Sequence, residues 1–192
     1  SVDTSFGTLK AFNNDGYDDA AIRGDPNERN ETSVSVFHGR SERGSQTATY
    51  QILVPVDYRL AAGDFNGDGI ADLMVPSGRN GVGERVPAGT IRVYYGRVGR
   101  LSAMPDAEIR IRPVLGERDI WDFEAAVGDY DGDGFSDIAV IDSGMIDSSS
   151  RMVPYTLRFF RGGPAGVPST ASLSSAADGG FVFNTEAFLN TF

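Results

Sequence analysis

Asp129-Tyr130-Asp131-Gly132-Asp133-Gly134-Phe135-Ser136-Asp137 is the stretch from which the fold can be argued. Carboxylates stand at positions 1, 3, 5 and 9 of this nonapeptide, and a glycine stands at position 6. Calcium loops draw oxygen ligands from this spacing, add a backbone carbonyl at position 7, and place a glycine where the chain turns sharply. The pattern predicts a calcium site with side-chain ligands from Asp129, Asp131, Asp133 and Asp137 and a carbonyl ligand from Phe135.

The same frame occurs upstream as Asp64-Phe65-Asn66-Gly67-Asp68-Gly69-Ile70-Ala71-Asp72. Here we expect side-chain ligands from Asp64, Asn66, Asp68 and Asp72 and a carbonyl ligand from Ile70. A pair of solvated Asp-Gly turns is the simpler interpretation of such stretches. Two loops in one register with similar flanks favour metal sites instead.

A third, degenerate copy is Asn13-Asn14-Asp15-Gly16-Tyr17-Asp18-Asp19. Its register places Asn13, Asp15 and Asp19 at ligand positions and the carbonyl of Tyr17 at position 7. Position 1 is Ala11, which offers no side-chain oxygen. We expect a weaker site that either binds calcium weakly or is held by hydrogen bonds alone.

The flanks of these loops indicate strands. An EF-hand requires helices on both sides and a glutamate at position 12, but position 12 is Val75 in one complete loop and Val140 in the other. Short apolar runs bounded by glycine precede and follow both loops, as in strands. Each metal loop is therefore predicted to join two strands.

Further strands recur in the same order after each loop. An apolar, aromatic strand ending at glycine covers residues 33–39, 91–96 and 156–162. A fourth strand is predicted at 47–52, 107–111 and 170–173, and a short strand at 6–11 precedes the first loop. Four antiparallel strands in each repeat are typical of a β-propeller blade. The fold class predicted is all-β, with about three four-stranded antiparallel blades.

Residues 62–73 and 127–138 resemble FG-GAP repeats, the blades of integrin-α-like propellers, and Ser5-Phe6-Gly7 fits the Phe-Gly that opens such a repeat. The resemblance covers residues 5–175. Two departures are Ala11 in the first loop and Val75-Pro76-Ser77-Gly78, which only partly matches the Gly-Ala-Pro of the family. The resemblance implies a ring of seven blades with Ca²⁺ at the blade edges.

The chain of 192 residues is predicted to be a single propeller segment. We expect blade 1 at about 5–57, blade 2 at about 58–115, blade 3 at about 120–176 and the start of a further blade at 181–192. Propellers have about four to eight blades, so three cannot close a ring. The segment is either part of a longer propeller, which we favour, or one copy in a homo-oligomer that completes the ring.

Charge and composition exclude several classes of partner. The net charge of −10 and the pI of 4.5 argue against nucleic acid and against an anionic membrane surface. The aspartates of the three loops account for this imbalance. There are no cysteines, and no apolar run approaches the ~18 residues of a membrane span. The chain opens with Ser1 instead of Met, which suggests a mature or excised segment.

The sequence holds no catalytic constellation, and its single histidine, His38, lies near a strand end. We therefore expect a protein that is not an enzyme. The predicted function is extracellular recognition or adhesion, with structural calcium and a protein or glycan ligand on the loop face. The concentration of free calcium outside cells is high enough to occupy weak sites. This favours an extracellular, cell-surface or, in bacteria, periplasmic location. The alternative is a lectin or an accessory domain of a secreted hydrolase or lyase.

Overall fold

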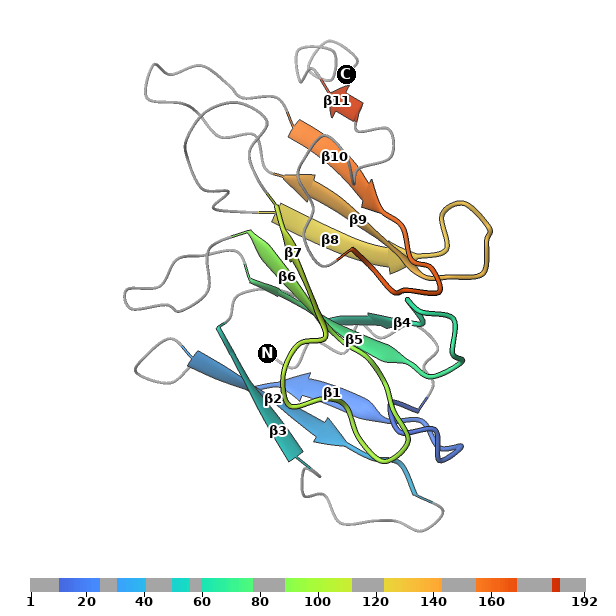
Figure 1. Cartoon of the computed structure of the whole chain (residues 1–192). Helices are drawn as coiled ribbons and strands as arrows, with labels where there is room; N and C mark the ends of the chain where they lie inside the picture. Colours follow the sequence, from blue (N-terminus) through green and yellow to red (C-terminus); the bar gives the residue numbers. More distant parts are fainter. Residues whose placement is uncertain are drawn as a thin grey trace, which may run out of the picture.

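The computed structural model describes residues 11–24, 31–40, 50–55, 60–77, 89–111, 123–142, 155–168 and 181–183. All regular elements in these ranges are strands, and they form three antiparallel sheets (Figure 1). The predicted all-β class and the antiparallel blades are confirmed. In the described residues no helix is long and apolar enough to cross a membrane.

Each sheet is built from strands that are neighbours in the chain. The first sheet contains β1 (Ala20–Arg23), β2 (Glu31–Phe37) and β3 (Tyr50–Pro55). The second contains β4 (Ala61–Gly63), β5 (Asp72–Ser77), β6 (Thr90–Tyr94) and β7 (Ala107–Arg110). The third contains β8 (Phe123–Gly128), β9 (Asp137–Asp142), β10 (Tyr155–Phe160) and β11 (Phe181–Phe183). As predicted, the two complete loops join strands, namely β4 to β5 and β8 to β9.

The end of the chain differs from the prediction. Residues 181–192 were expected to open a further blade, but Phe181–Phe183 pairs with Tyr155–Leu157 and completes the third sheet. A short apolar strand can serve at either edge of a sheet, because both edges offer unpaired backbone groups. The predicted strands at 6–11 and 170–173, apart from Ala11, and residues 184–192 lie outside the described residues. The blade boundaries remain predictions.

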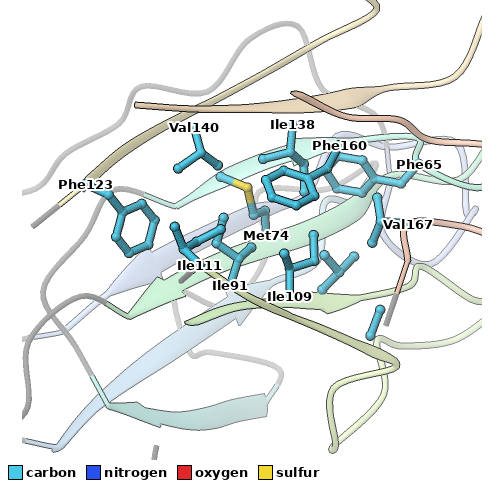
Figure 2. Close-up of a cluster of buried hydrophobic side chains, with 12 residues drawn as sticks. Phe65, Met74, Ile91, Ile109, Ile111, Phe123, Ile138, Val140, Phe160 and Val167 are labelled. Carbon is cyan, nitrogen blue, oxygen red and sulfur yellow. The ribbon is translucent and has the colours of Figure 1, made fainter. Parts of the chain in front are cut away.

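Two apolar clusters join the sheets. One lies between the second and third sheets and includes Phe65, Met74, Ile138 and Phe160 (Figure 2). The other lies between the first and second sheets and includes Phe12. Because side chains alternate along a strand, the second sheet packs its rear face against the first sheet and its forward face against the third.

β5 illustrates this alternation. Leu73 and Val75 belong to the cluster shared with the first sheet, and Met74 belongs to the cluster shared with the third. The sheets therefore stack in chain order, with the three loops predicted from the sequence along one side of the stack (Figure 1). This arrangement brings the three loops into equivalent places in successive blades.

Candidate metal centre

The three loops share one backbone conformation. Numbered from position 1 to position 9, they run from 11 to 19, from 64 to 72 and from 129 to 137. The position-6 glycines have φ angles of +86°, +81° and +91°. Position 4 is also left-handed, with +58° at Asn14, +74° at Gly67 and +78° at Gly132. Glycine and asparagine tolerate this conformation best, so residue type at positions 4 and 6 permits the same turn in all three loops.

An aspartate at position 1 anchors the two complete loops. Asp64 Oδ1 accepts hydrogen bonds from the amides of positions 4 and 5 at 2.7 and 3.2 Å, and its Oδ2 accepts one from position 6 at 2.8 Å. Asp129 makes the same three bonds at 2.7, 3.1 and 3.0 Å. Ala11 has no side-chain acceptor, so the first loop keeps its shape without this anchor.

Positions 3 and 5 add two hydrogen bonds in every loop. The position-3 side-chain oxygen of Asn13, Asn66 or Asp131 accepts the position-5 amide at 3.1, 3.1 and 3.2 Å. The position-5 carboxylate accepts the position-7 amide at 2.9, 2.8 and 3.0 Å. Each aspartate or asparagine thus has one oxygen fixed by the backbone, which orients the side chain.

Position 9 is an aspartate in all three loops, and both of its oxygens bind backbone amides. One oxygen of Asp19, Asp72 and Asp137 accepts the position-2 amide of the same loop at 2.8, 2.8 and 2.9 Å. The other accepts the amide of the glycine two residues after the end of β2, β6 or β10, at 2.9, 2.8 and 2.9 Å. We call these three residues the closing glycines; they are Gly39, Gly96 and Gly162. The position-9 carboxylate therefore links the loop to the segment that follows β2, β6 or β10.

Close packing explains why glycine stands there. A Cβ atom added at any closing glycine would lie 2.3 Å from the carbonyl oxygen of position 8 in the same repeat. This separation is far below van der Waals contact, and the obstacle is backbone. The closing glycine and the position-9 aspartate therefore form one structural unit.

Burial raises the carboxyl pKa of two position-9 aspartates, Asp72 and Asp19. Burial, together with the smaller effect of the charges of Asp68 and Asp64, raises the pKa of Asp72 to about 7 against the opposing effect of its two amide donors. At exposed Asp15 the Tyr17 amide instead lowers the carboxyl pKa. A cation beside Asp72 would favour its ionised form, as metal binding to a carboxylate requires.

The third loop brings three predicted ligands together. Asp129, Asp131 and Asp137 each offer one carboxylate oxygen, and these oxygens lie within 4.8 Å of one another. Oxygens that share a calcium ion at 2.3–2.6 Å can be about 5 Å apart at most, so the cluster fits one ion. In the described part of the chain it is the one such group of three. Arg161 Nε lies 3.2 Å from Asp131 Oδ2, so a positive group already lies beside the cluster.

Sequence reasoning found the loops but missed part of their chemistry. It assigned position 9 only to metal ligation and did not foresee its two amide partners or the Arg161 contact. The recurrence of a strand-ending glycine in all three repeats was visible and could have indicated the first of these. The ligand set, including Asp133 and the carbonyls of Tyr17, Ile70 and Phe135, remains a prediction.

Comparisons with known proteins point to one repeat family. Residues 12–75 match a family described as FG-GAP-like repeat, and residues 57–94 match the FG-GAP repeat. These matches cover the first two loops. The third loop lies beyond them, and its assignment to the same repeat is based on its equivalent hydrogen bonds and φ angles.

Two curated relatives share part of this sequence. The phosphatidylinositol-glycan-specific phospholipase D of Rattus norvegicus is 40% identical over 85 residues, and that of Mus musculus is 39% identical over 85 residues. The aligned part covers 42% of this chain and 9% of each relative. The chain thus spans a small part of the length of these enzymes.

Proposed function

Because the FG-GAP repeats of residues 12–94 make this chain a member of the FG-GAP repeat family, we propose that it is a calcium-binding propeller segment in which the ion is structural. The observation that carries this proposal is the cluster of Asp129, Asp131 and Asp137 within 4.8 Å. Oxygen donors of this number and charge suit a hard divalent cation. The second loop has the same frame, with Asn66 in place of one carboxylate.

Thermal unfolding in excess calcium and in chelator tests this proposal. A ligand that binds only the folded state at a hundred times its Kd stabilises it by about 2.7 kcal/mol for each site. For a domain of this size each kcal/mol raises the midpoint by about 2–4 °C. We expect a rise of roughly 5–10 °C for each occupied site. An unchanged midpoint would mean that the loops are Asp-Gly turns.

The loops should also differ in affinity. Asp133→Ala is expected to weaken calcium binding more than Asp15→Ala. The loop of Asp133 has a carboxylate at position 1, whereas the loop of Asp15 has Ala11 there. Isothermal titration of the two variants with calcium measures this difference. Equal losses would contradict the ranking.

The biological role proposed is extracellular recognition or adhesion through a protein or glycan bound on the loop face. The support is the common side on which the loops lie (Figure 1) and the suitability of weak calcium sites to the extracellular medium. A glycan array and a pull-down from extracellular proteins, both in calcium, test the two ligand classes. Loss of binding in chelator would tie the ligand to the loop face, whereas no binding to either class would contradict the role.

A second candidate role is that of an accessory domain in a larger hydrolase, and the phospholipase D relatives favour it specifically. In this role the chain itself performs no chemistry. Purified chain should then leave a glycosylphosphatidylinositol substrate intact. Cleavage by the chain that persists in a loop variant such as Asp133→Ala would show that this segment carries its own active site.

A further inference from the structure

Arg161 is a basic side chain that lies beside the acidic cluster of the third loop. Its Nε atom lies 3.2 Å from Asp131 Oδ2, whereas Asp131 Oδ1 accepts the Asp133 amide. Asp131 is one of the three residues whose carboxylate oxygens lie within 4.8 Å of one another. The positive charge of Arg161 is therefore next to the carboxylates that would hold a calcium ion.

Contacts on both sides of Arg161 hold its backbone against the loop of its own blade. The amide of Gly162, the next residue, donates to Asp137 Oδ1 at 2.9 Å. Two residues before Arg161, the ring of Phe159 packs edge-on against the ring of Tyr130, with centroids 5.4 Å apart. The position of Arg161 beside the loop thus follows from the packing of the third blade itself.

The residue before the closing glycine also lies beside the loop in the first blade, where it is His38. The Tyr17 amide is the main cause of the lowered pKa of Asp15, and the charge of His38 contributes to it. The second blade has Tyr95 at this position, and its hydroxyl oxygen accepts the Val167 amide at 3.0 Å. The residue type at this position therefore decides whether a loop has a positive charge beside it.

The charge at this position is matched to the residue at position 3 of the loop. The second loop has Asn66 at position 3 and three carboxylates in all, whereas the third has Asp131 and four carboxylates. With every carboxylate ionised, the second loop has a charge of −3, and Arg161 brings the third from −4 to −3. The two complete loops therefore present the same net charge to a cation.

We propose that Arg161 is the counter-charge of the third loop, which stabilises the four carboxylates in the absence of calcium and lowers the affinity of the loop for the ion. The effect on affinity rests on the calcium-binding function proposed above. A positive side chain beside a cation site weakens binding by Coulomb repulsion, and water and salt limit this effect because the Arg161 side chain is 58% exposed. We expect Arg161 to reduce the calcium affinity of the third loop about three- to tenfold.

Calcium titration followed by NMR tests the effect on affinity at each loop separately. The position-6 amides of Gly134 and Gly69 donate to Asp129 and Asp64 at 3.0 and 2.8 Å, so their signals report on the third and the second loop. In Arg161→Gln the Gly134 midpoint should move to about three- to tenfold lower calcium, and the Gly69 midpoint should stay unchanged. An unchanged Gly134 midpoint, or an equal change at both glycines, would overturn the proposal.

Arg110→Gln is the matched control. Arg110 Nε lies 3.3 Å from Glu108 Oε1, and the Arg110 side chain is 51% exposed, so the variant removes the same charge from a similar ion pair outside the loops. It should leave both calcium midpoints unchanged. Arg161→Lys keeps a positive charge and should bind calcium within about twofold of the wild type. A Gly134 shift in either variant as large as that in Arg161→Gln would overturn the proposal.

A double variant tests the charge balance. Asp131→Asn alone leaves the third loop with a charge of −2 beside Arg161 and should weaken binding as measured at Gly134. Adding Arg161→Gln restores a charge of −3, with an asparagine at position 3 as in the second loop. The double variant should therefore recover the wild-type midpoint to within about threefold. A double variant that binds calcium no better than Asp131→Asn would overturn the proposal.

Thermal unfolding in chelator tests the counter-charge without calcium. Arg161→Gln should lower the midpoint by about 1–3 °C at low salt and by less at high salt. Arg110→Gln should lower it less, because Glu108 keeps a second cation, Arg92, at 3.6 Å.

The two measurements separate this proposal from the calcium-binding function. If neither Gly134 nor Gly69 responded to calcium in any variant, the calcium-binding function would fail, and the chelator result would decide the counter-charge alone. A salt-dependent loss in Arg161→Gln would then support it, and an unchanged midpoint would overturn it. A Gly134 response that occurs in Arg161→Gln and is absent from the wild type would support the proposal.

Discussion

Position 1 of the first loop is the residue at which the three loops differ in their hydrogen bonds. Asp64 and Asp129 each accept three backbone amides, whereas Ala11 accepts none through its side chain. The first loop nevertheless has the same left-handed backbone conformation at positions 4 and 6. We therefore expect Ala11→Asp to convert it into a complete site, with a calcium affinity about tenfold higher, equivalent to about 1.4 kcal/mol.

Isothermal titration with calcium measures this gain as one additional binding site, with an affinity comparable to that of the two complete loops. Ala11→Asn is the matched control, because it supplies an oxygen without a charge and should gain less. An unchanged number of sites in Ala11→Asp would show that the first loop cannot hold the ion for another reason.

The position-9 aspartate should separate fold stability from calcium binding. Asp72 is fully buried and accepts the amides of Phe65 and Gly96. Asp72→Asn turns one acceptor into a donor, so it leaves a buried amide unpaired at a cost of about 1–3 kcal/mol. Asp68→Asn changes an exposed loop residue and should alter stability in chelator by less than about 0.5 kcal/mol.

Urea unfolding in chelator and in calcium tests the contrast. Both variants should lose calcium-dependent stabilisation, but only Asp72→Asn should be destabilised in chelator. Equal stability of the two variants in chelator would contradict the structural role of position 9.

At the scale of the strand, the closing glycine fixes how β6 meets the loop before β5. Gly96→Ala would place a methyl group 2.3 Å from the Ala71 carbonyl oxygen. Backbone must move to relieve this contact, so we expect a loss of about 2–4 kcal/mol of unfolding free energy. Gly163→Ala is the control, because a Cβ there meets nothing within 4 Å. A loss for Gly163→Ala as large as that for Gly96→Ala, measured by urea unfolding, would contradict this explanation.

Most of the strands could be predicted from the sequence, because the local sequence signals agree with one another. Glycine-bounded apolar runs and the repeated loop frame located β5, β6, β9 and β10 to within a few residues. The outer strand of the third sheet was misplaced, because Phe181-Val182-Phe183 carries no signal for the edge it joins. The pairing of β11 with β10 depends on tertiary contacts. A three-residue apolar segment does not specify which strand it pairs with.

At the scale of the whole molecule, the first two loops also form backbone hydrogen bonds to the next sheet. The sequence did not indicate these contacts. The ligand spacing identified positions 1, 3, 5, 7 and 9. The backbone hydrogen bonds from the first two loops to the next sheet instead use the carbonyls of positions 1 and 2, in Ala11, Phe12, Asp64 and Phe65. Every residue has a backbone carbonyl, so the sequence does not show which carbonyls accept these hydrogen bonds. The aromatic side chain at position 2 is present in all three loops and could have indicated a buried role. Phe12 and Phe65 are buried, whereas Tyr130 is 48% exposed.

These contacts between neighbouring sheets lead to a prediction about cooperativity. Phe65 is 0% exposed and packs in the cluster between the second and third sheets (Figure 2). Phe65→Ala should leave a cavity there and lower the unfolding free energy by about 3–5 kcal/mol. Because repeat stability depends on contacts between neighbours, amides of β9 and β10 should lose more hydrogen-exchange protection than those of β2.

Met104→Ala is the matched control, since Met104 is a large apolar side chain that is 72% exposed. It should change stability by less than about 0.5 kcal/mol and leave the exchange pattern unaltered. If Phe65→Ala lowered protection equally in all three sheets, the blades would unfold as one unit. The interface between the second and third sheets would then be no weaker than the sheets themselves, and the blade would not be the unit of local opening.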